Sequence, residues 1–401
     1  MKGVRGHMRA ILVAGGSAGH INPALAIADK IAQVFPDSEI LFIGTGRGLE
    51  SKLVKRAGYA FTSIKSAGFQ RKLTPKNIGR NAKAVYYFLT ANLEAQKIID
   101  KFKPDVVIGT GGYVTAPVLR TASKAGIKAV AHESNSLPGM ATKMLTRYVD
   151  RVFVSSSDTL KHLPPIQANR NVKYVITGNP LRKEFRKIDY KDKGSNENQS
   201  RTDALTKLNL KEGMTILSFG GSLGANKITE AVVELLKWER EQNNQSNQCK
   251  PINHIHAYGG NGKAIFEKLL LQNGLSAVNG RNIFSEYIHN MYTCITAADL
   301  VICRSGSMSQ TEIKAFGRAS IQIPWSGAAE NHQYYNALTM KNAGAAILIT
   351  DDEISGAKLI ETVSRLYNDR LRIRLMEEKA KEMSEPNAAG VIVSEIIDLL
   401  K

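Results

Sequence analysis

The chain has 401 residues, of which 43% are hydrophobic and 22% charged, which is the ordinary composition of a globular protein. No apolar run approaches the ~20 residues that a membrane-spanning helix needs, and the polar N-terminus leads straight into the first expected strand, so we expect neither a spanning segment nor a signal peptide. A charge of +18, from 54 Lys and Arg against 36 Asp and Glu, predicts attraction to a polyanion: nucleic acid, an anionic membrane surface or a phosphorylated substrate.

The first element is a strand, a glycine turn and a helix. The apolar run from Ile11 to Val13 predicts a buried strand, Gly15-Gly-Ser-Ala-Gly19 a turn, and Pro23 the start of an apolar periodic helix. Such a turn lets backbone N–H groups approach a ligand, and the helix N-terminus adds partial positive charge. The stretch therefore favours an anion or a sugar hydroxyl.

The same pattern recurs at Ile216-Leu-Ser-Phe-Gly-Gly-Ser-Leu-Gly-Ala225, and a third glycine turn follows the β-rich run 106–108. Two similarly built halves predict two Rossmann-like domains, which the usual length of about 150 residues per domain also favours.

Strand and helix signals alternate through both halves, which is typical of parallel sheets covered by helices. The expected strands, after the first, are 40–44, 61–64, 104–108, 129–131, 215–219, 254–258, 300–303, 320–323 and 346–349. The expected helices include 49–57, 76–102 and 115–124, and the tail 355–401 is expected to be largely helical. The polar stretches 191–203 and 241–249 are expected to be mobile loops.

Residues 66–89 carry both basic and aromatic side chains. Such a segment can lie against anionic lipid headgroups, or it can be a core helix with a solvated basic face, because Ile78, Ala82, Val85 and Leu89 recur at helical spacing. The residues that would face a membrane are Phe69, Lys72, Leu73, Lys76, Arg80 and Lys83.

Two sets of polar residues in the first half follow expected strands, where α/β folds bind ligands. His20 comes directly after the first glycine turn and is either a general base or a structural side chain that caps the turn. His132-Glu-Ser-Asn135 follows a strand and either reads sugar or acceptor oxygens or forms a hydrophilic loop.

Two further sets lie in the second half. Cys303-Arg-Ser-Gly-Ser-Met-Ser-Gln-Thr-Glu312 follows a strand and opens a helix, so Arg304 and the following N–H groups could bind a diphosphate and Glu312 a ribose; the alternative is an ordinary capped helix. The amide-rich stretch 324–336 is typical of a reader of sugar hydroxyls.

Taken in order, these motifs resemble the peptidoglycan N-acetylglucosaminyltransferases, from about Arg9 to the C-terminus. The motifs that carry the resemblance are Gly15-Gly-Ser-Ala-Gly-His-Ile-Asn-Pro23, Gly111-Gly-Tyr-Val114, His132-Glu-Ser-Asn135, Gly178-Asn-Pro-Leu-Arg182, Gly220-Gly-Ser-Leu-Gly-Ala225, Cys303-Arg-Ser-Gly306 and His332-Gln333 with Asn336-Ala337.

The resemblance implies an α/β fold of the GT-B class, in which two Rossmann-like domains face a cleft. It implies an inverting transfer of GlcNAc from UDP-GlcNAc to the C4 hydroxyl of MurNAc in lipid I, which yields lipid II for peptidoglycan synthesis. The expected domains are 8–177 for the acceptor and membrane, 178–375 for UDP-GlcNAc, and 376–401 as a C-terminal helix that packs back on the first domain.

The polyprenyl diphosphate acceptor implies a peripheral protein at the cytoplasmic face of the bacterial plasma membrane. An anionic membrane and other proteins of cell-wall synthesis or division are then the expected partners, and nucleic acid is not. No carboxylate cluster is available to hold a metal beside a diphosphate, so no obligatory metal or other cofactor is expected.

By the resemblance, His20 and Glu133 would lie beside the acceptor, with His20 as the base. The donor would be bound by Ser17, Ala18, Gly19, Asn135, Arg182, Ser222, Ile288, Arg304, Ser305, Gly306, Ser307, Met308, Ser309, Glu312, His332 and Gln333, with Ile288 at the uracil and His332 and Gln333 at the sugar. The chain departs from the family at Ser17 and Ala18, where the usual turn has Thr and Gly, and at His332, which is often Gln.

Two other classes of function remain open from the sequence. One is a different GT-B transferase or a UDP-GlcNAc 2-epimerase, which shares the two-domain architecture. The other is a basic scaffold, either at the membrane surface or nucleotide-binding, with a decayed catalytic site. The first is disfavoured by the 132–135 and 303–306 motifs, and the second by the presence of His20, Glu133, Arg182 and Glu312.

Overall fold

A computed structural model describes residues 6–46, 50–66, 74–166, 172–187, 195–221, 224–244, 251–276 and 280–401, with only the backbone described in parts of three helices. The chain forms two compact units. Unit 1 comprises Met1–Arg186 and Glu385–Lys401, and unit 2 comprises Lys187–Ser384. Residues 178–186 therefore lie in unit 1 and residues 376–384 in unit 2, which shifts both expected domain boundaries along the chain.

Unit 1 is built on a parallel sheet with the strand order β3-β2-β1-β4-β5-β6-β7. Its strands are β1 (Arg9–Ala14), β2 (Glu39–Gly44), β3 (Ala60–Ser63), β4 (Val106–Gly111), β5 (Lys128–Glu133), β6 (Arg151–Val154) and β7 (Lys173–Ile176). Its helices are α1 (Ala18–Val34), α2 (Glu50–Arg56), α3 (Pro75–Phe102), α4 (Thr115–Lys124), α5 (Met140–Leu145), α6 (Ser157–Leu160) and α15 (Ala388–Leu400). The 3-10 helix η1 (Lys183–Lys187) follows β7, where the chain passes from unit 1 to unit 2.

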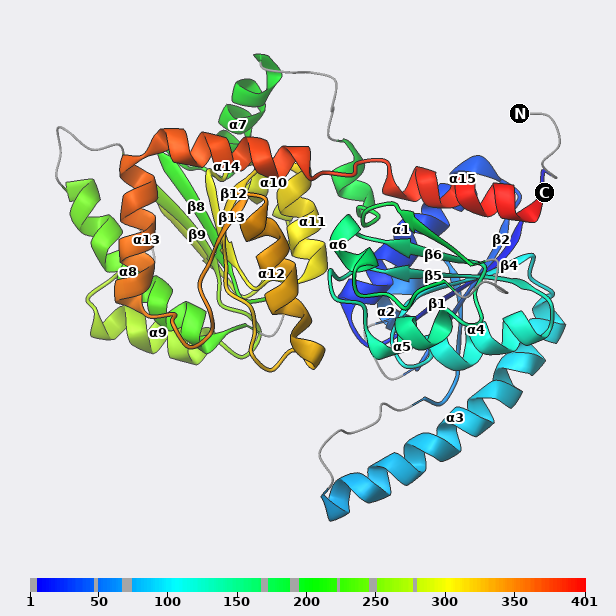
Figure 1. Cartoon of the computed structure of the whole chain (residues 1–401). Coiled ribbons are helices and arrows are strands. Elements are labelled where there is room, and N and C mark those ends of the chain that lie inside the picture. The colour runs from blue at the N-terminus through cyan, green and yellow to red at the C-terminus, as the bar shows by residue number, and fades with distance from the viewer. Residues whose placement is uncertain are drawn as a thin grey trace. The chain divides into compact units, whose positions relative to one another are not determined.

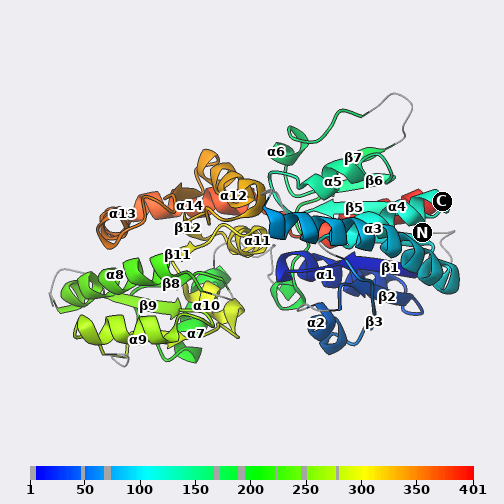
Figure 2. The same cartoon turned by 90° about the horizontal axis from the view of Figure 1, so that it is seen from below.

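Helices cover both faces of the unit 1 sheet (Figures 1 and 2). One core cluster joins the sheet to α3, α4 and α5 through residues such as Ala95, Val118 and Leu145. A second cluster joins the opposite face to α1 and α15, where Ile27 and Ile392 are both fully buried. Strands that are buried on both faces need continuous apolar runs, which is the pattern that the sequence shows at 11–13 and 106–108.

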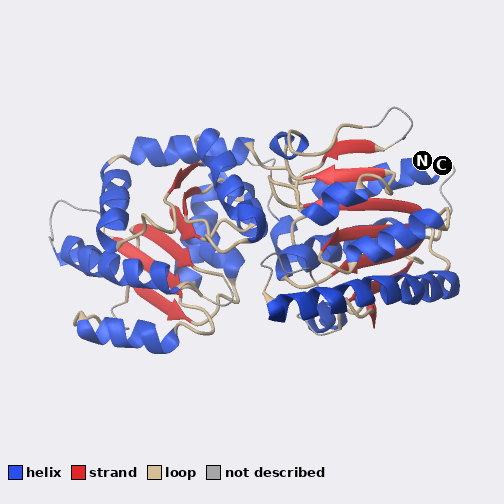
Figure 3. Ribbon diagram, turned by 60° about the horizontal axis from the view of Figure 1, so that its bottom comes forward, coloured by secondary structure: helices blue, strands red, loops and turns tan. Residues whose placement is uncertain are grey.

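Unit 2 repeats this architecture with the strand order β10-β9-β8-β11-β12-β13, again all parallel (Figure 3). Its strands are β8 (Met214–Phe219), β9 (Ile252–Ala257), β10 (Asn282–Ser285), β11 (Leu300–Cys303), β12 (Ala319–Gln322) and β13 (Ala346–Leu348). Its helices are α7 (Ser195–Lys207), α8 (Asn226–Asn244), α9 (Lys263–Gln272), α10 (Met291–Ala297), α11 (Ser307–Ala315), η2 (Ala329–Asn331), α12 (His332–Asn342), α13 (Gly356–Asn368) and α14 (Arg370–Glu382).

The structure corrects part of the expectation of two mobile loops, since residues 191–194 and 245–249 lie outside the described residues. Residues 195–203 belong to helix α7, and residues 241–244 form the last turn of α8. The polar stretch in α7 is followed by Ala204 and Leu205, which are buried, and α7 packs on α10. The apolar anchor of this helix therefore lies at its C-terminal end, beyond the polar stretch that predicted a loop.

Three short strands, β6, β7 and β10, are not among the expected elements. β7 and β10 lie at the edges of their sheets, and none of their residues is fully buried. An edge strand of four residues carries no apolar run long enough for a periodicity argument. Among the described residues, no helix combines the length and apolarity that crossing a bilayer requires.

Candidate active site

The glycine turns of unit 1 meet at the carboxyl edge of its sheet. The chain order reverses between the neighbouring strands β1 and β4, which is where open α/β sheets bind their ligands. Gly15 N donates a hydrogen bond of 3.2 Å to Gly111 O, and a Cβ on Gly112 would lie 2.5 Å from Gly15 O. Only glycine at 112, whose φ is +90°, permits this backbone contact.

His20 lies in the first turn of α1, directly above this contact. Its ring packs against Gly111, where an added Cβ would come within 2.3 Å of His20 Nδ1. Thr110 Oγ1 donates to the His20 backbone oxygen at 2.7 Å, which fixes the turn. No described side chain caps the N-terminus of α1, so the N–H groups of Ala18 and Gly19, next to the exposed Ser17, can meet a ligand beside the half-buried imidazole.

Glu133, at the end of β5, uses its carboxylate to shape the loop that follows. One oxygen accepts hydrogen bonds from the backbone N and the Nδ2 of Asn135, at 3.0 and 3.1 Å. The other accepts from Gly139 N at 3.0 Å and from Thr142 Oγ1 at 2.6 Å. The side chain is buried, so its geometry suits positioning of Asn135 better than proton transfer.

His132 lies beneath these groups and is neutral at physiological pH. Burial, with the nearby His20 as a smaller contribution, lowers the pKa of His132 to about 4, although its hydrogen bond to Gly178 and the Glu133 charge act to raise that pKa. Its Nε2 lies 3.2 Å from Gly178 O, an arrangement in which Nε2 donates. Asn179 Nδ2 donates to Ser134 O at 3.0 Å, so the end of β5 is bonded to the segment that leads out of unit 1.

Arg182 lies on the same outgoing segment. Its guanidinium pairs with Glu184 at 3.0 Å and stacks over the Phe185 ring, 4.6 Å from the centroid. The structure assigns Arg182 to unit 1, although the sequence places it in the donor domain.

In unit 2 the corresponding position is the N-terminus of α11, after β11. Gly306 is the N-cap, and no described side chain caps the helix, so the N–H groups of Ser307, Met308 and Ser309 are open to an anion. Ser305 is fully buried, and its Oγ has no hydrogen-bond partner among the described residues. Asn336 Nδ2 donates to Ser305 O at 3.1 Å and holds this turn in place.

The Arg304 guanidinium is paired with other protein groups and is not directed at an anion bound to this turn. Its guanidinium bonds to Asp351 Oδ1 at 2.6 Å and to the backbone oxygens of Ile323 and Pro324 at 3.2 and 3.3 Å. The expectation from the sequence was a forked contact with a diphosphate. In the structure this arginine instead joins the loops after β11, β12 and β13.

The stretch after β12 is held in an unusual backbone conformation. Gln333 Oε1 accepts a hydrogen bond from Trp325 N at 2.9 Å, and His332 Nδ1 lies 2.7 Å from Ala329 O. The residues before His332, Glu330 and Asn331, have φ values of 55° and 56°, which is strained backbone of the kind that clusters at functional sites.

The remaining expected donor residues are also in unit 2. Ile288 is buried in the loop after β10, and Glu312 is buried on α11, where its charge helps to raise the pKa of the Cys303 thiol to about 12, a shift that burial dominates. Ser222, Phe69, Lys72 and Leu73 lie outside the described residues. Lys76, Arg80 and Lys83 lie on α3, for which only the backbone is described at these positions. The described residues include no group of three or more His, Cys, Asp or Glu side chains placed to hold a metal.

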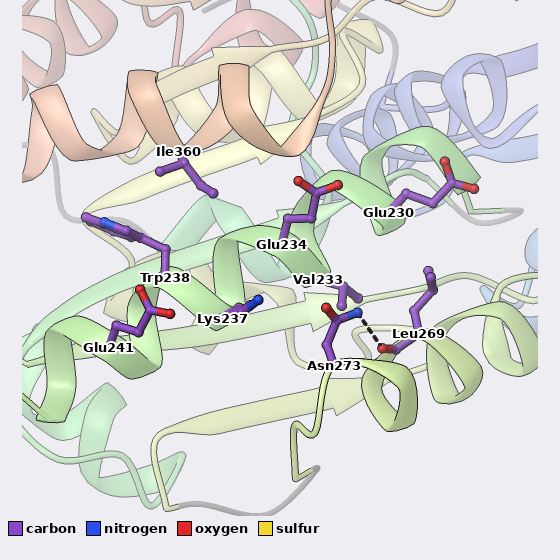
Figure 4. Close-up of a pocket in the computed structure, with 9 residues that line it drawn as sticks. All are labelled: Glu230, Val233, Glu234, Lys237, Trp238, Glu241, Leu269, Asn273 and Ile360. Carbon is purple, nitrogen blue, oxygen red and sulfur yellow. Dashed lines mark hydrogen bonds between the residues drawn. The ribbon is translucent and has the colours of Figure 1, made fainter.

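A groove of about 640 Å³ on unit 2 lies between α8, α9 and α13 (Figure 4). Three glutamates, Glu230, Glu234 and Glu241, line it beside a single lysine, Lys237. A nucleotide diphosphate would be repelled by this excess of negative charge, so the groove does not suit the donor.

Sequence reasoning missed Asp351, and within the stretch 324–336 it did not single out Trp325 or Ser326. Asp351 and Ser326 belong to the Arg304 network, and Trp325, which is 52% exposed, stands beside Gln333. Asp351 follows closely on the short strand β13, and Trp325 follows closely on β12. Both therefore meet the criterion that selected the other candidates, which is a place directly after a strand of a parallel sheet.

Two doubly wound units, each with an open helix N-terminus at the switch point of its sheet, define the GT-B class of nucleotide-sugar enzymes. The glycosyltransferase family 28 N-terminal domain matches residues 10–154, and the family 28 C-terminal domain matches residues 215–392. The chain belongs to this family of glycosyltransferases.

A relative from Alkaliphilus oremlandii (strain OhILAs) is 38% identical over 98% of this chain and 100% of its own length. It is named UDP-N-acetylglucosamine--N-acetylmuramyl-(pentapeptide) pyrophosphoryl-undecaprenol N-acetylglucosamine transferase. Among solved structures, Acinetobacter baumannii MurG matches with a TM-score of 0.73 at 24% identity, over 98% of this chain and 99% of that chain. The UDP-GlcNAc 2-epimerase from Neisseria meningitidis matches with a TM-score of 0.63 at 13% identity, over 98% and 100%, which shows a shared fold alone.

The buried, neutral His132 predicts a pH dependence of stability. Its pKa is about 4 in the folded chain and about 6.5 when unfolded, so the unfolded state binds more protons between these values. The free energy of unfolding should therefore fall as the pH drops from about 6.5 to about 4. His132→Gln, which keeps a donor for Gly178 O but does not titrate, should make this fall shallower in urea unfolding followed by circular dichroism.

The matched control is His162→Gln, because His162 is an exposed histidine of the same unit. An unchanged slope in His132→Gln, or an equal change in His162→Gln, would contradict the assignment.

Proposed function

We propose that this protein is an inverting N-acetylglucosaminyltransferase that moves GlcNAc from UDP-GlcNAc to the C4 hydroxyl of MurNAc in lipid I and so makes lipid II for peptidoglycan synthesis. The full-length relatives carry the name of this reaction at 34–38% identity. The structural observation that carries the proposal is the open N-terminus of α11 at the switch point of unit 2, which is a site for the diphosphate of a nucleotide sugar.

In this proposal unit 2 binds the donor. The N–H groups of Ser307, Met308 and Ser309 receive the diphosphate, and the buried Ser305 hydroxyl, which lacks a partner among the described residues, supplies a further donor. Glu312 takes the ribose hydroxyls and Ile288 packs on the uracil. His332 and the Nε2 group of Gln333 read the sugar, because the Gln333 oxygen is already bonded to Trp325 N.

The remaining donor residues have different roles. Arg304 acts by positioning the loops rather than by touching the diphosphate, since its guanidinium is bonded to Asp351 and to two carbonyl groups. Ser222 and Arg182 keep the diphosphate role that the family resemblance implies. In unit 1, Ser17, Ala18, Gly19 and Asn135 complete the set.

Unit 1 presents the acceptor hydroxyl to His20. The imidazole takes the proton of the C4 hydroxyl as that oxygen forms a bond to the anomeric carbon of GlcNAc. The bond from that carbon to the phosphate oxygen breaks on the opposite side, and its electron pair leaves with UDP, whose charge is stabilised by the α11 N–H groups. One such displacement inverts the anomeric centre. Glu133 positions Asn135 and leaves proton transfer to His20.

The test is transfer of labelled GlcNAc from UDP-GlcNAc to a short-chain lipid I analogue. The full chain should place label in the lipid fraction with inverted anomeric configuration. Replacement of His20 by Ala should lower kcat by about a hundredfold to ten-thousandfold, which is the usual contribution of a general base. The matched control is His162→Ala, an exposed histidine of the same unit, which should leave kcat unchanged.

Conversion of UDP-GlcNAc to its 2-epimer without transfer would favour the epimerase alternative. Binding of UDP-GlcNAc with neither reaction would favour a scaffold. Full turnover in His20→Ala would remove His20 as the base and leave the reaction itself in place.

We further propose that unit 1 lies on the anionic cytoplasmic face of the bacterial plasma membrane, where its lipid acceptor is found. The net charge of +18 supports this. So do exposed apolar side chains on two helices that share one core cluster with the sheet: Tyr86 and Leu93 on α3 are 62% and 68% exposed, and Met140 and Met144 on α5 are 67% and 42% exposed. α4 packs against both of these helices, and the exposed Arg147 follows α5. Other cell-wall synthesis or division proteins are proposed as partners at that surface.

Vesicle flotation tests this membrane surface. The double substitution of Met140 and Met144 by Ser should weaken binding to vesicles that contain anionic lipid, because it removes apolar area that would enter the interface. Leu271→Ser is the matched control, since Leu271 is 82% exposed but lies on α9 of unit 2. Equal loss in the two variants, or no loss in the double variant, would contradict a membrane surface at α5.

A further inference from the structure

The Asp351 carboxylate contacts groups from three other segments at the carboxyl edge of unit 2. Asp351 Oδ1 accepts from Arg304 Nη1 at 2.6 Å, and Oδ2 accepts from Ser326 Oγ at 2.9 Å. Lys227 Nζ donates to the backbone oxygen of Asp351 at 2.6 Å and lies 3.9 Å from Oδ2. Asp351 is 8% exposed and the Arg304 side chain 12%, so this ion pair is largely buried, whereas the Lys227 side chain is 55% exposed.

Each of the three partners belongs to a segment that borders the donor site. Lys227 is in the first turn of α8, just after the glycine turn that follows β8. Arg304 leads into the N-terminus of α11, where the diphosphate is expected. Ser326 lies next to Trp325, whose backbone N is bonded to Gln333, the residue expected at the sugar.

We propose that Asp351 is the positioning residue of the donor site and that it sets the spacing between the diphosphate-binding turn and the sugar-binding loop. The inference rests on the proposed function of unit 2 as the UDP-GlcNAc site.

The charge arrangement explains why a carboxylate is needed. The Arg304 guanidinium would otherwise be a buried cation close to the α11 N-terminus and would compete for the incoming diphosphate at the wrong position. Paired with Asp351, it holds the carbonyl groups of Ile323 and Pro324 while the N–H groups of α11 remain open. Burial raises the pKa of Asp351, but the Arg304 and Ser326 hydrogen bonds outweigh it and the pKa is lowered, so the carboxylate is charged at neutral pH.

The same sheet offers a matched ion pair at its opposite edge. Asp299, which precedes β11, accepts from Arg201 at 3.0 Å and from Thr215 N at 2.7 Å. Its side chain is 18% exposed against 9% for Asp351, and both carboxylates tie neighbouring segments together. A purely structural ion pair would affect stability at either edge, whereas a positioning residue would affect ligand binding at one edge only.

The experiment compares Asp351→Asn with Asp299→Asn in the full chain, using thermal unfolding and calorimetric titration with UDP-GlcNAc and with UDP. Both variants should have a lower Tm. Asp351→Asn should bind UDP-GlcNAc about tenfold more weakly, because small misplacements of ligand-binding groups are costly, while Asp299→Asn should keep the wild-type affinity.

A third variant, Ser326→Ala, removes only the hydrogen bond between Ser326 and Asp351. It leaves the Arg304–Asp351 ion pair in place, and Ser326 itself is exposed. It should weaken binding of UDP-GlcNAc more than binding of UDP, because Ser326 holds only the loop expected at the sugar.

The inference is overturned if folded Asp351→Asn binds both ligands as the wild type does, if Asp299→Asn loses affinity to the same extent, or if Ser326→Ala binds UDP-GlcNAc with unchanged affinity. Failure of the wild-type chain to bind UDP-GlcNAc at all would instead contradict the proposed function.

Discussion

The parallel arrangement of both sheets is the constraint on which the rest of the structure depends. Within each sheet every strand runs in the same direction, so the loops after the strands meet at one edge of that sheet. The chain order reverses beside β1 in one sheet and beside β8 in the other, and this reversal leaves room for a ligand at that edge. The backbone hydrogen bond from Gly15 to Gly111 fixes this position in unit 1. His20 is placed by that contact, since its ring packs against Gly111.

Charged side chains at the two edges mostly serve each other or the backbone. The Glu133 carboxylate is occupied by four hydrogen bonds within its own loop, and Arg304 is paired with Asp351. At the N-termini of α1 and α11, neither of which has a described side-chain cap, the groups offered to a ligand are backbone N–H groups. This arrangement suits a reaction in which the diphosphate must not be bound too tightly in the ground state. The backbone N–H groups can still stabilise the negative charge that develops on the leaving diphosphate.

The sequence predicts the elements whose signal is local. The glycine turns, the helix Thr115–Lys124 and the central strands follow from apolar runs and turn residues, and the order of motifs was enough to suggest the family. The partner of Arg304 could not be predicted, because Asp351 is 47 residues away and nothing in either motif encodes the pairing. The helix α7 was missed for a similar reason, since Ala204 and Leu205, which anchor it, lie beyond its polar stretch.

The central claim is that the open N-terminus of α11 binds the diphosphate of the donor. Amide hydrogen exchange of the full chain with and without UDP tests it most directly. The account predicts that UDP slows exchange in the segment 305–309 and leaves the acidic groove along α8 unchanged. Slower exchange at residues 230–241 with no change at 305–309 would contradict the account.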